Sequence, residues 1–174
     1  MRRAPAPLAA LTAVTAIAFV PAVARAQEQE RSIIRSPGDH PAYIFEAEPQ
    51  ILIGYGGPFD DDRRSDNARF GVGFRGAVHI TNGFIPNINN SVAVGFGFDI
   101  ATSGRVFVPV VLQWNFWLST HWSVFGEPGI AFSSGDQVVY PTIFVGGRFH
   151  ITDRIAITAR VGYPEFALGV SFLL

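Results

Sequence analysis

Residues 69–80 read RFGVGFRGAVHI, and the side chains of this stretch alternate between two kinds. One set of positions is bulky and apolar apart from a single glycine, and comprises Phe70, Val72, Phe74, Gly76, Val78 and Ile80. The positions between them are small or polar, and comprise Arg69, Gly71, Gly73, Arg75, Ala77 and His79. Side chains that alternate with a period of two point to opposite faces of a β-strand. The stretch therefore predicts a strand with one apolar face and one small or charged face.

The same alternation recurs from Ala42 to the end of the chain. It is found in eight runs, at about residues 43–55, 69–80, 91–101, 105–118, 122–132, 139–151, 155–163 and 166–174. The bulky face of these runs carries no charged or amide side chain, whereas the other face mixes glycine, alanine and serine with acids and arginine. We therefore predict an all-β domain of eight strands over residues 42–174.

The distribution of bulk between the two faces indicates which face lies inside. The interior of a closed eight-stranded sheet is cramped, so small residues fit inside and large apolar ones must lie outside. An apolar exterior is stable in lipid, and a closed barrel leaves no backbone group unpaired there. We predict a closed antiparallel eight-stranded transmembrane β-barrel. The alternative is a soluble periplasmic β-barrel binder in which the two faces are inverted.

The first 41 residues have a different character from the rest of the chain. Arg2 and Arg3 precede an apolar stretch from Leu8 to Val20, and residues 24–26 read Ala-Arg-Ala. This is the pattern of a cleavable signal peptide, which we place at residues 1–26. Residues 27–41 are polar and contain prolines and a glycine, so we expect a flexible periplasmic tail. No apolar run long enough for a transmembrane helix follows residue 30.

Composition excludes several classes of function. The chain has no cysteine, which rules out disulfides and thiolate chemistry. Its net charge of −1 provides no basic face for nucleic acid. The four histidines, His40, His79, His121 and His150, lack the spacing of metal ligands, and we interpret them as polar plugs. We therefore expect neither a metal nor a cofactor.

Charged side chains on the inner face of the predicted barrel form a candidate site. They are Glu46, Glu48, Arg69, Arg75, Asp99, Glu127, Arg148 and Arg160. Buried charges need partners, so we predict an ion-pair network in the lumen. Counting along the hairpin of residues 43–80 places Glu48 nearly opposite Arg75, the best single pair.

The ends of the predicted strands carry aromatic residues and suggest an orientation. Residues that would form two aromatic girdles at the membrane interfaces are Tyr43, Tyr55, Phe70, Trp114, Trp122, Phe132, Phe149 and Tyr163. Residues 78–82, 116–120 and 149–153 resemble one another and end the second, fourth and sixth strands, so we interpret them as periplasmic turns. The long connection at 56–67 would be extracellular. Its acidic cluster, Asp60–Asp62, could bind calcium, although a solvated loop is the favoured interpretation.

Over residues 42–174 the chain resembles small eight-stranded outer-membrane barrels of the OmpA/OmpX type. The last strand of such proteins alternates large apolar residues and usually ends in Phe or Trp, a signal that the barrel-assembly machinery reads. Here the alternating residues are Phe166, Leu168, Val170, Phe172 and Leu174. The final residue is leucine, which departs from the usual pattern. The resemblance implies an outer membrane of a Gram-negative bacterium, with outer-membrane lipids and that machinery as partners.

The function favoured by these features is a non-enzymatic structural or surface-interaction role, with an extracellular partner that the sequence does not identify. A narrow channel is an alternative, and would need a water path past Arg75 and Glu127. A lipid-modifying enzyme is a further alternative, for which Ser119 and Ser123 flank His121. That trio would lie in a periplasmic turn, in the wrong leaflet for lipid A.

Overall fold

The computed structural model describes residues 31–54, 69–134, 139–163 and 165–174. The predicted signal peptide, Tyr55 and the acidic cluster at Asp60–Asp62 lie outside these residues. For Arg69 the backbone is described but the side chain is not. Among the described residues, no helix is long and apolar enough to cross a membrane.

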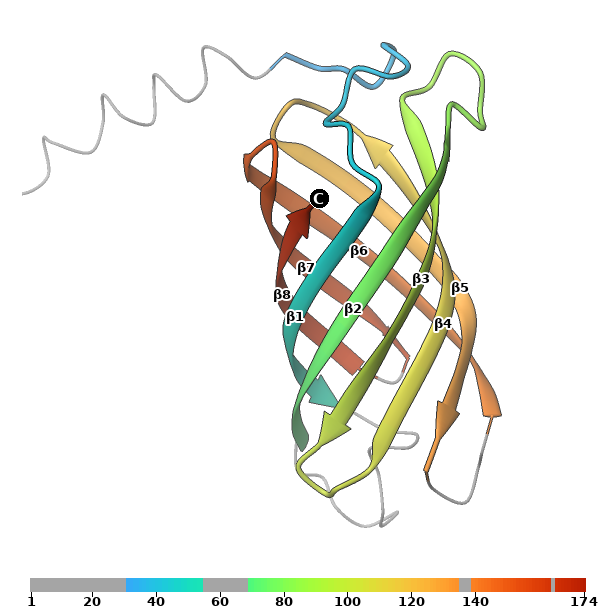
Figure 1. Ribbon diagram of the computed structural model, residues 1–174, viewed down its shortest axis with the longest axis vertical. Helices are drawn as coiled ribbons and strands as arrows, with labels where there is room; N and C mark the ends of the chain where they lie inside the picture. Colours follow the sequence, from blue (N-terminus) through green and yellow to red (C-terminus); the bar gives the residue numbers. More distant parts are fainter. Residues whose placement is uncertain (1–30, 55–68, 135–138, 164) are drawn as a thin grey trace, which may run out of the picture. The chain divides into compact units, whose positions relative to one another are not determined.

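The described residues form eight strands that close into one antiparallel barrel (Figure 1). The strands are β1 (Phe45–Gly54), β2 (Arg69–Asn82), β3 (Asn90–Ala101), β4 (Val106–Trp117), β5 (Trp122–Ser133), β6 (Val139–Thr152), β7 (Ile155–Tyr163) and β8 (Glu165–Leu173). Each strand pairs with the next in sequence, and β1 pairs with β8 to complete the ring. The predicted fold class is confirmed, and the strand boundaries agree with the predicted runs to within a few residues.

The two ends of the barrel differ. At the end where β1 begins and β8 ends, short turns join β4 to β5 and β6 to β7, and residues 83–89 join β2 to β3 (Figure 1). We call this the terminal end. Strands β1, β3, β5 and β7 end at the opposite end, which we call the loop end.

Alternation along each strand separates an apolar outer face from an inner face of mixed character. In β6 the outward side chain of Ile143 is 59% exposed, whereas its inward neighbour Phe144 is 2% exposed. The same contrast runs through the other strands, so bulky aliphatic and aromatic side chains cover the outside of the barrel. Water does not stabilise so large an apolar surface, whereas a bilayer does.

Three prolines within strands each lie where the pairing with one neighbour is interrupted. The β1–β8 register omits Pro49, the β3–β4 register omits Pro109, and the β4–β5 register omits Pro128. Proline lacks the N–H that a ladder needs, so these interruptions follow directly from the residue. The fourth, Pro141, lies beyond the end of β7, whose last residue pairs with Ile143. The barrel thus tolerates its prolines because each remains paired on its other side.

The apolar outer face predicts that the cost of a charge depends on depth along a strand. Val145 lies near the middle of β6 and Ile151 near its end, and their side chains are 57% and 55% exposed. In lipid we expect Val145→Arg to lower the free energy of unfolding by about 2–4 kcal/mol and Ile151→Arg by about 0–1 kcal/mol. Urea unfolding in phospholipid vesicles, followed by tryptophan fluorescence, measures both values. Equal losses at the two positions would contradict a lipid-covered exterior, since in water the two sites are equally accessible.

Candidate functional site

Buried charged side chains fill the middle of the barrel lumen. Five carboxylates and three guanidinium groups line it, and each of these eight residues is at most 4% exposed. They come from seven of the eight strands and are Glu46, Glu48, Arg75, Asp99, Glu127, Arg148, Arg160 and Glu165. We call these eight residues the lumen network. The following contacts show that it consists of three arginine-centred clusters.

Arg160 on β7 is the centre with the most partners. Its Nη1 lies 2.9 Å from Glu48 Oε1, and its Nε lies 3.1 Å from Glu127 Oε2. The same guanidinium donates to the amide oxygen of Gln50 at 2.6 Å. Glu48 also accepts a hydrogen bond from Ser171, at 2.9 Å. One arginine therefore joins β1, β5 and β7 through the interior of the barrel.

Arg148 on β6 forms a second centre nearer the terminal end. Its Nη2 lies 2.7 Å from Glu46 Oε1, and its Nη1 donates to Asn115 Oδ1 at 2.6 Å. The guanidinium lies over the ring of Phe125, 4.3 Å from its centroid. A cation over an aromatic face is stabilised by the ring quadrupole, so Phe125 contributes to holding this charge.

Arg75 on β2 forms the third centre, with two carboxylates. Its Nη1 lies 3.2 Å from Asp99 Oδ2 and its Nη2 lies 3.6 Å from Glu165 Oε1. Gln50 links this centre to that of Arg160, because its Nε2 donates to Asp99 Oδ1 at 2.7 Å while its carbonyl accepts from Arg160. The polar side chains therefore form a connected set across the lumen.

Glycine and alanine make room for these long side chains. Between Arg160 and Glu48 lies β8, where Ala167 pairs with Arg160 and Gly169 pairs with Gln50. A Cβ added at Gly169 would lie 2.7 Å from Glu48 Oε1, closer than real Cβ contacts. The small residues on the inner face are therefore required by the charged ones beside them.

The structure places seven of the eight predicted lumen charges in this network. The side chain of Arg69 lies outside the described residues. The predicted register is correct, because Glu48 and Arg75 are opposite one another on β1 and β2. The predicted ion pair between them is wrong, since Glu48 pairs with Arg160 and Arg75 with Asp99 and Glu165. Long side chains in a narrow lumen reach past small neighbours to strands further round the ring.

The sequence analysis missed Glu165 because the predicted strands at residues 155–163 and 166–174 leave it in the connection between them. Counting back by two from Ala167 along the inner face of the last strand would have placed Glu165 in the lumen. It also missed the amides that complete the network. Gln113 donates to Glu127 Oε1 at 2.8 Å, and Gln50 and Asn115 bind arginines as described above. An amide at an inward position of a charged lumen is the signal that could have identified them.

An apolar cluster lies at the loop end of the lumen. It consists of Leu52, Ala101, Phe107, Ala131, Tyr140 and Ala167. The rings of Phe107 and Tyr140 meet edge to face, with centroids 5.1 Å apart. These residues are at most 5% exposed, so the cluster packs in the lumen on the loop-end side of the network.

Residues 31–44 cross the terminal end, and we call this segment the strap. Its backbone forms an isolated bridge between Ser32 and Ser119, and Ile33 is 2% exposed in a cluster with Tyr43, Trp117 and Leu173. Asn89 fastens the strap further: its backbone N–H donates to Ile34, and its side chain binds the backbone of residues 38 and 39. The structure thus differs from the expected flexible tail over residues 31–41. The buried side chain of Ile33 and the hydrogen bonds of Asn89 hold this segment.

Tyr43 is the one described girdle residue that faces inward. It is 8% exposed, and burial raises the pKa of its hydroxyl to about 12. The alternation shifts by one residue just after it, because the N–H groups of Ile44 and Phe45 both donate to the carbonyl of Leu174. The prediction that Tyr43 belongs to an aromatic girdle is therefore wrong.

Most of the other predicted girdle residues do lie on the outside, near the strand ends. The exposed ones are Phe70, Trp122, Phe132, Phe149 and Tyr163. Trp114 is half-buried, and its indole N–H donates to Asn90 Oδ1 at 3.2 Å. In β8 the alternating residues of the predicted assembly signal point outward, with Phe166 partly covered.

The structure does not assemble the serine–histidine trio considered for an enzyme. Ser123 lies on the inner face, fully buried, with its Oγ 2.9 Å from His150 Nε2 rather than near His121. His121 lies 3.1 Å from the hydroxyl of Thr120 instead. A substrate cannot reach the hydroxyl of Ser123 in this arrangement. Within the described ranges, no group of three His, Asp or Glu side chains is placed to hold a metal ion.

Comparison with known proteins supports the fold. No protein-family model and no curated protein matches the chain. Among solved structures, a protein from the de novo design of transmembrane β-barrels is 16% identical, with a TM-score of 0.53 over 74% of this chain and 95% of its own. The outer-membrane protein Ail of Yersinia pestis, solved in a phospholipid nanodisc, is 12% identical, with a TM-score of 0.50 over 76% of this chain and 100% of its own. The designed TMB2.3 is 11% identical, with a TM-score of 0.51 over 79% and 98%.

These matches span nearly the whole length of the compared proteins, which are transmembrane barrels of natural and designed origin. The chain therefore has the closed eight-stranded fold of small transmembrane β-barrels. At these identities the likeness concerns the fold, and the side chains in the lumen remain the guide to function.

Removing the central cation of the network tests how the lumen is held together. Arg160→Met leaves the buried Glu48 and Glu127 without their cation, and we expect a loss of about 3–5 kcal/mol in the free energy of unfolding. Urea titration in phospholipid vesicles measures it. Arg154→Met, at an exposed turn position, is the matched control and should change the value by less than about 0.5 kcal/mol. A similar loss in the free energy of unfolding for the two variants would show that the lumen network does not stabilise the barrel.

Removing the side chain that fastens the strap tests its attachment. Asn89→Ala leaves the N–H of Gly38 and the carbonyl of Asp39 without their partners, so we expect the strap to detach. Trypsin should then cleave after Arg35 many times faster than in the unaltered protein. Asn87→Gly is the control, since glycine accepts the positive φ of 64° at that position and the strap contacts stay intact. Rapid cleavage of the unaltered protein would contradict a bound strap.

Proposed function

We propose that this protein is an outer-membrane β-barrel with a non-enzymatic structural or surface-interaction role, in which the barrel anchors the loop-end connections and does not conduct. The observation that carries the proposal is the filled lumen. The network occupies its middle, the cluster around Phe107 and Tyr140 covers it on one side, and the strap covers it on the other. A channel would need a continuous water path, and these three layers leave the charged groups almost unexposed.

The proposed membrane location rests on the outer face of the barrel. Outward side chains such as Ile143, Val145 and Val161 are more than half exposed and apolar. The chain begins with a pattern typical of an export signal, and its fold is shared with an outer-membrane protein. These features together favour the outer membrane of a Gram-negative bacterium, with the terminal end in the periplasm.

Anything the protein presents to the outside would then come from the loop end. The longest connection there in sequence is residues 55–68, which reads YGGPFDDDRRSDNA. Four aspartates and two arginines make this segment strongly polar. We infer that an extracellular partner would be bound through charged and hydrogen-bonding groups rather than through an apolar surface.

The conducting alternative is tested in planar bilayers. We expect the purified protein to give no discrete current steps, although heat-dependent electrophoretic mobility shows that it is folded. Current steps whose frequency rises with the amount of inserted protein would overturn the proposal and favour a narrow channel past Arg75 and Glu127. The enzymatic alternative is tested by mass spectrometry of lipid A from cells with and without the gene, where we expect identical spectra.

Orientation gives a separate prediction. Because the chain has no cysteine, single cysteines can be introduced at Ser103, in the loop-end connection of β3 and β4, and at Arg154, in a terminal-end turn. Both positions are exposed. On intact cells a membrane-impermeant maleimide should label Ser103→Cys and spare Arg154→Cys, while both react after lysis. The reverse pattern would place the terminal end outside the cell.

A further inference from the structure

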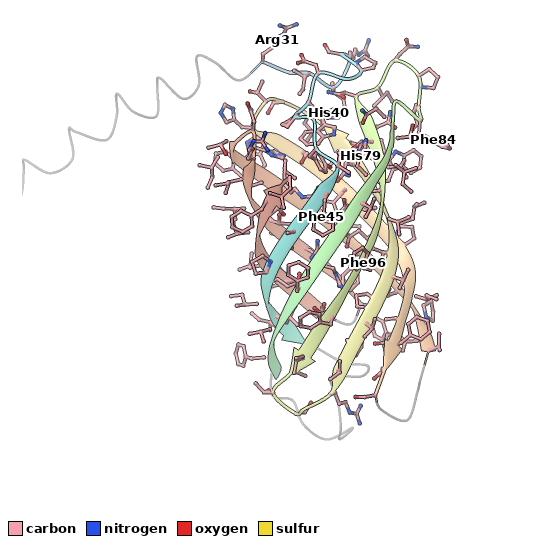
Figure 2. The ribbon with its side chains drawn as sticks, in the orientation of Figure 1. Arg31, His40, Phe45, His79, Phe84 and Phe96 are labelled. Carbon is pink, nitrogen blue, oxygen red and sulfur yellow. The ribbon has the colours of Figure 1, made fainter. Side chains whose placement is uncertain are left out.

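Imidazole and aromatic rings form the contact between the strap and the barrel. His40 of the strap stacks on Trp117, with ring centroids 4.9 Å apart and an interplanar angle of 9°. Tyr43 of the strap meets the ring of His79 edge-on, at 5.4 Å. Trp117 in turn contacts His150, at 5.0 Å. Figure 2 shows His40 and His79 close together at the terminal end. The strap is therefore held by rings of a kind that can gain charge near neutral pH.

Three of these imidazoles have an enclosed nitrogen without a hydrogen-bond partner. In His40 this is Nε2, and its Nδ1 lies 2.9 Å from the carbonyl oxygen of Pro41. The Nε2 of His150 lies 2.9 Å from Ser123 Oγ, but its Nδ1 is enclosed without a hydrogen-bond partner. The Nδ1 of His79 is enclosed in the same way. A neutral imidazole can leave one nitrogen bare, whereas an imidazolium has an N–H donor on each nitrogen. An enclosed donor without an acceptor is costly, so this packing favours the neutral rings.

The charged groups around the rings of His79 and His150 do not offset that cost. His79 faces His40 of the strap, and His150 faces Arg148 on its own strand and His121 in the β4–β5 turn. Glu46, a carboxylate of the lumen network on β1, is engaged by Arg148. Protonation of His150 thus adds positive charge beside Arg148, while His79 has a hydrogen bond with the uncharged side chain of Asn82 and no carboxylate beside it among the groups that act on it.

The remaining titratable groups are those of the strap itself and the turns beneath it. Asp39, His40 and Asp153 line a cavity of about 240 Å³ between the strap and these turns. The cavity offers water a place next to the rings once the strap loosens.

We propose that the strap is an acid-releasable plug of the terminal end. At neutral pH the uncharged rings of His79 and His150 hold Tyr43 and Trp117 in contact, and the strap stays seated. On acidification these two rings gain protons, and residues 31–43 leave the mouth while the strands remain paired. The inference concerns this segment and stands independently of the role proposed for the loop end.

A spin label on the strap tests this directly, because the chain has no native cysteine. Arg35→Cys places a nitroxide on an exposed strap position, and Arg154→Cys places one on the adjacent turn. Spectra of the full-length mature protein in phospholipid vesicles are recorded while the pH falls from about 7.5 to about 4.5, a range that spans ordinary histidine titration. We expect the strap label to change reversibly from a mainly immobilised to a mainly mobile spectrum. The label at residue 154 should not change.

Variants assign the effect to the two rings. With His79→Gln and His150→Gln together, which do not titrate, the strap label should stay immobilised at both pH values. Asn89→Ala should give a mobile strap at both. A strap label that is immobile throughout the titration of the unaltered protein, or equally pH-sensitive in the double glutamine variant, would overturn the proposal. If the double variant does not fold, as judged by electrophoretic mobility, His150→Gln alone should reduce the acid-induced change.

Discussion

An eight-stranded barrel encloses so little space that its own side chains fill it. This constraint sorts the residues of every strand, because the bulky ones fit only on the outside and the inside must be shared between small residues and a few long ones. Gly169 lies where a Cβ would strike Glu48, and Gly97 where one would crowd Arg75. The glycine-rich inner face and the phenylalanine-rich outer face are therefore two consequences of one geometry.

Charged side chains in such a lumen are stable only when each has a partner of opposite charge beside it. Removing a carboxylate from water costs several kcal/mol, and a partner with good geometry has to offset that cost. Arg160 does so for both Glu48 and Glu127, and Gln50 connects this centre to that of Arg75. Strands that are not neighbours in the sheet are thereby tied through the middle of the barrel. The same packing that stabilises the closed form leaves little room for passage, which is why the filled lumen supports an anchoring role.

The alternation of residue types was sufficient to predict the strands, their faces and the closed barrel. It was also sufficient for the register of Glu48 against Arg75, because a hairpin count depends only on the chain. It could not predict the ion pairs, since partners such as Glu48 and Arg160 are more than a hundred residues apart and meet only after closure. The strap was missed because a polar segment with prolines gives no periodic signal, and the burial of Ile33 depends on Trp117 from a distant strand.

The central claim is that the bulky face meets lipid and the other face meets the protein's own side chains. Trp122 is 46% exposed on the outside, and Trp117 is 1% exposed in the mouth of the lumen. Two variants isolate them: Trp114→Phe with Trp117→Phe retains Trp122, and Trp114→Phe with Trp122→Phe retains Trp117. In vesicles of dibrominated phospholipid, we predict strong quenching of the fluorescence of Trp122 and little quenching of that of Trp117. Quenching of Trp117 with Trp122 unaffected, or of neither, would contradict the assignment of the two faces.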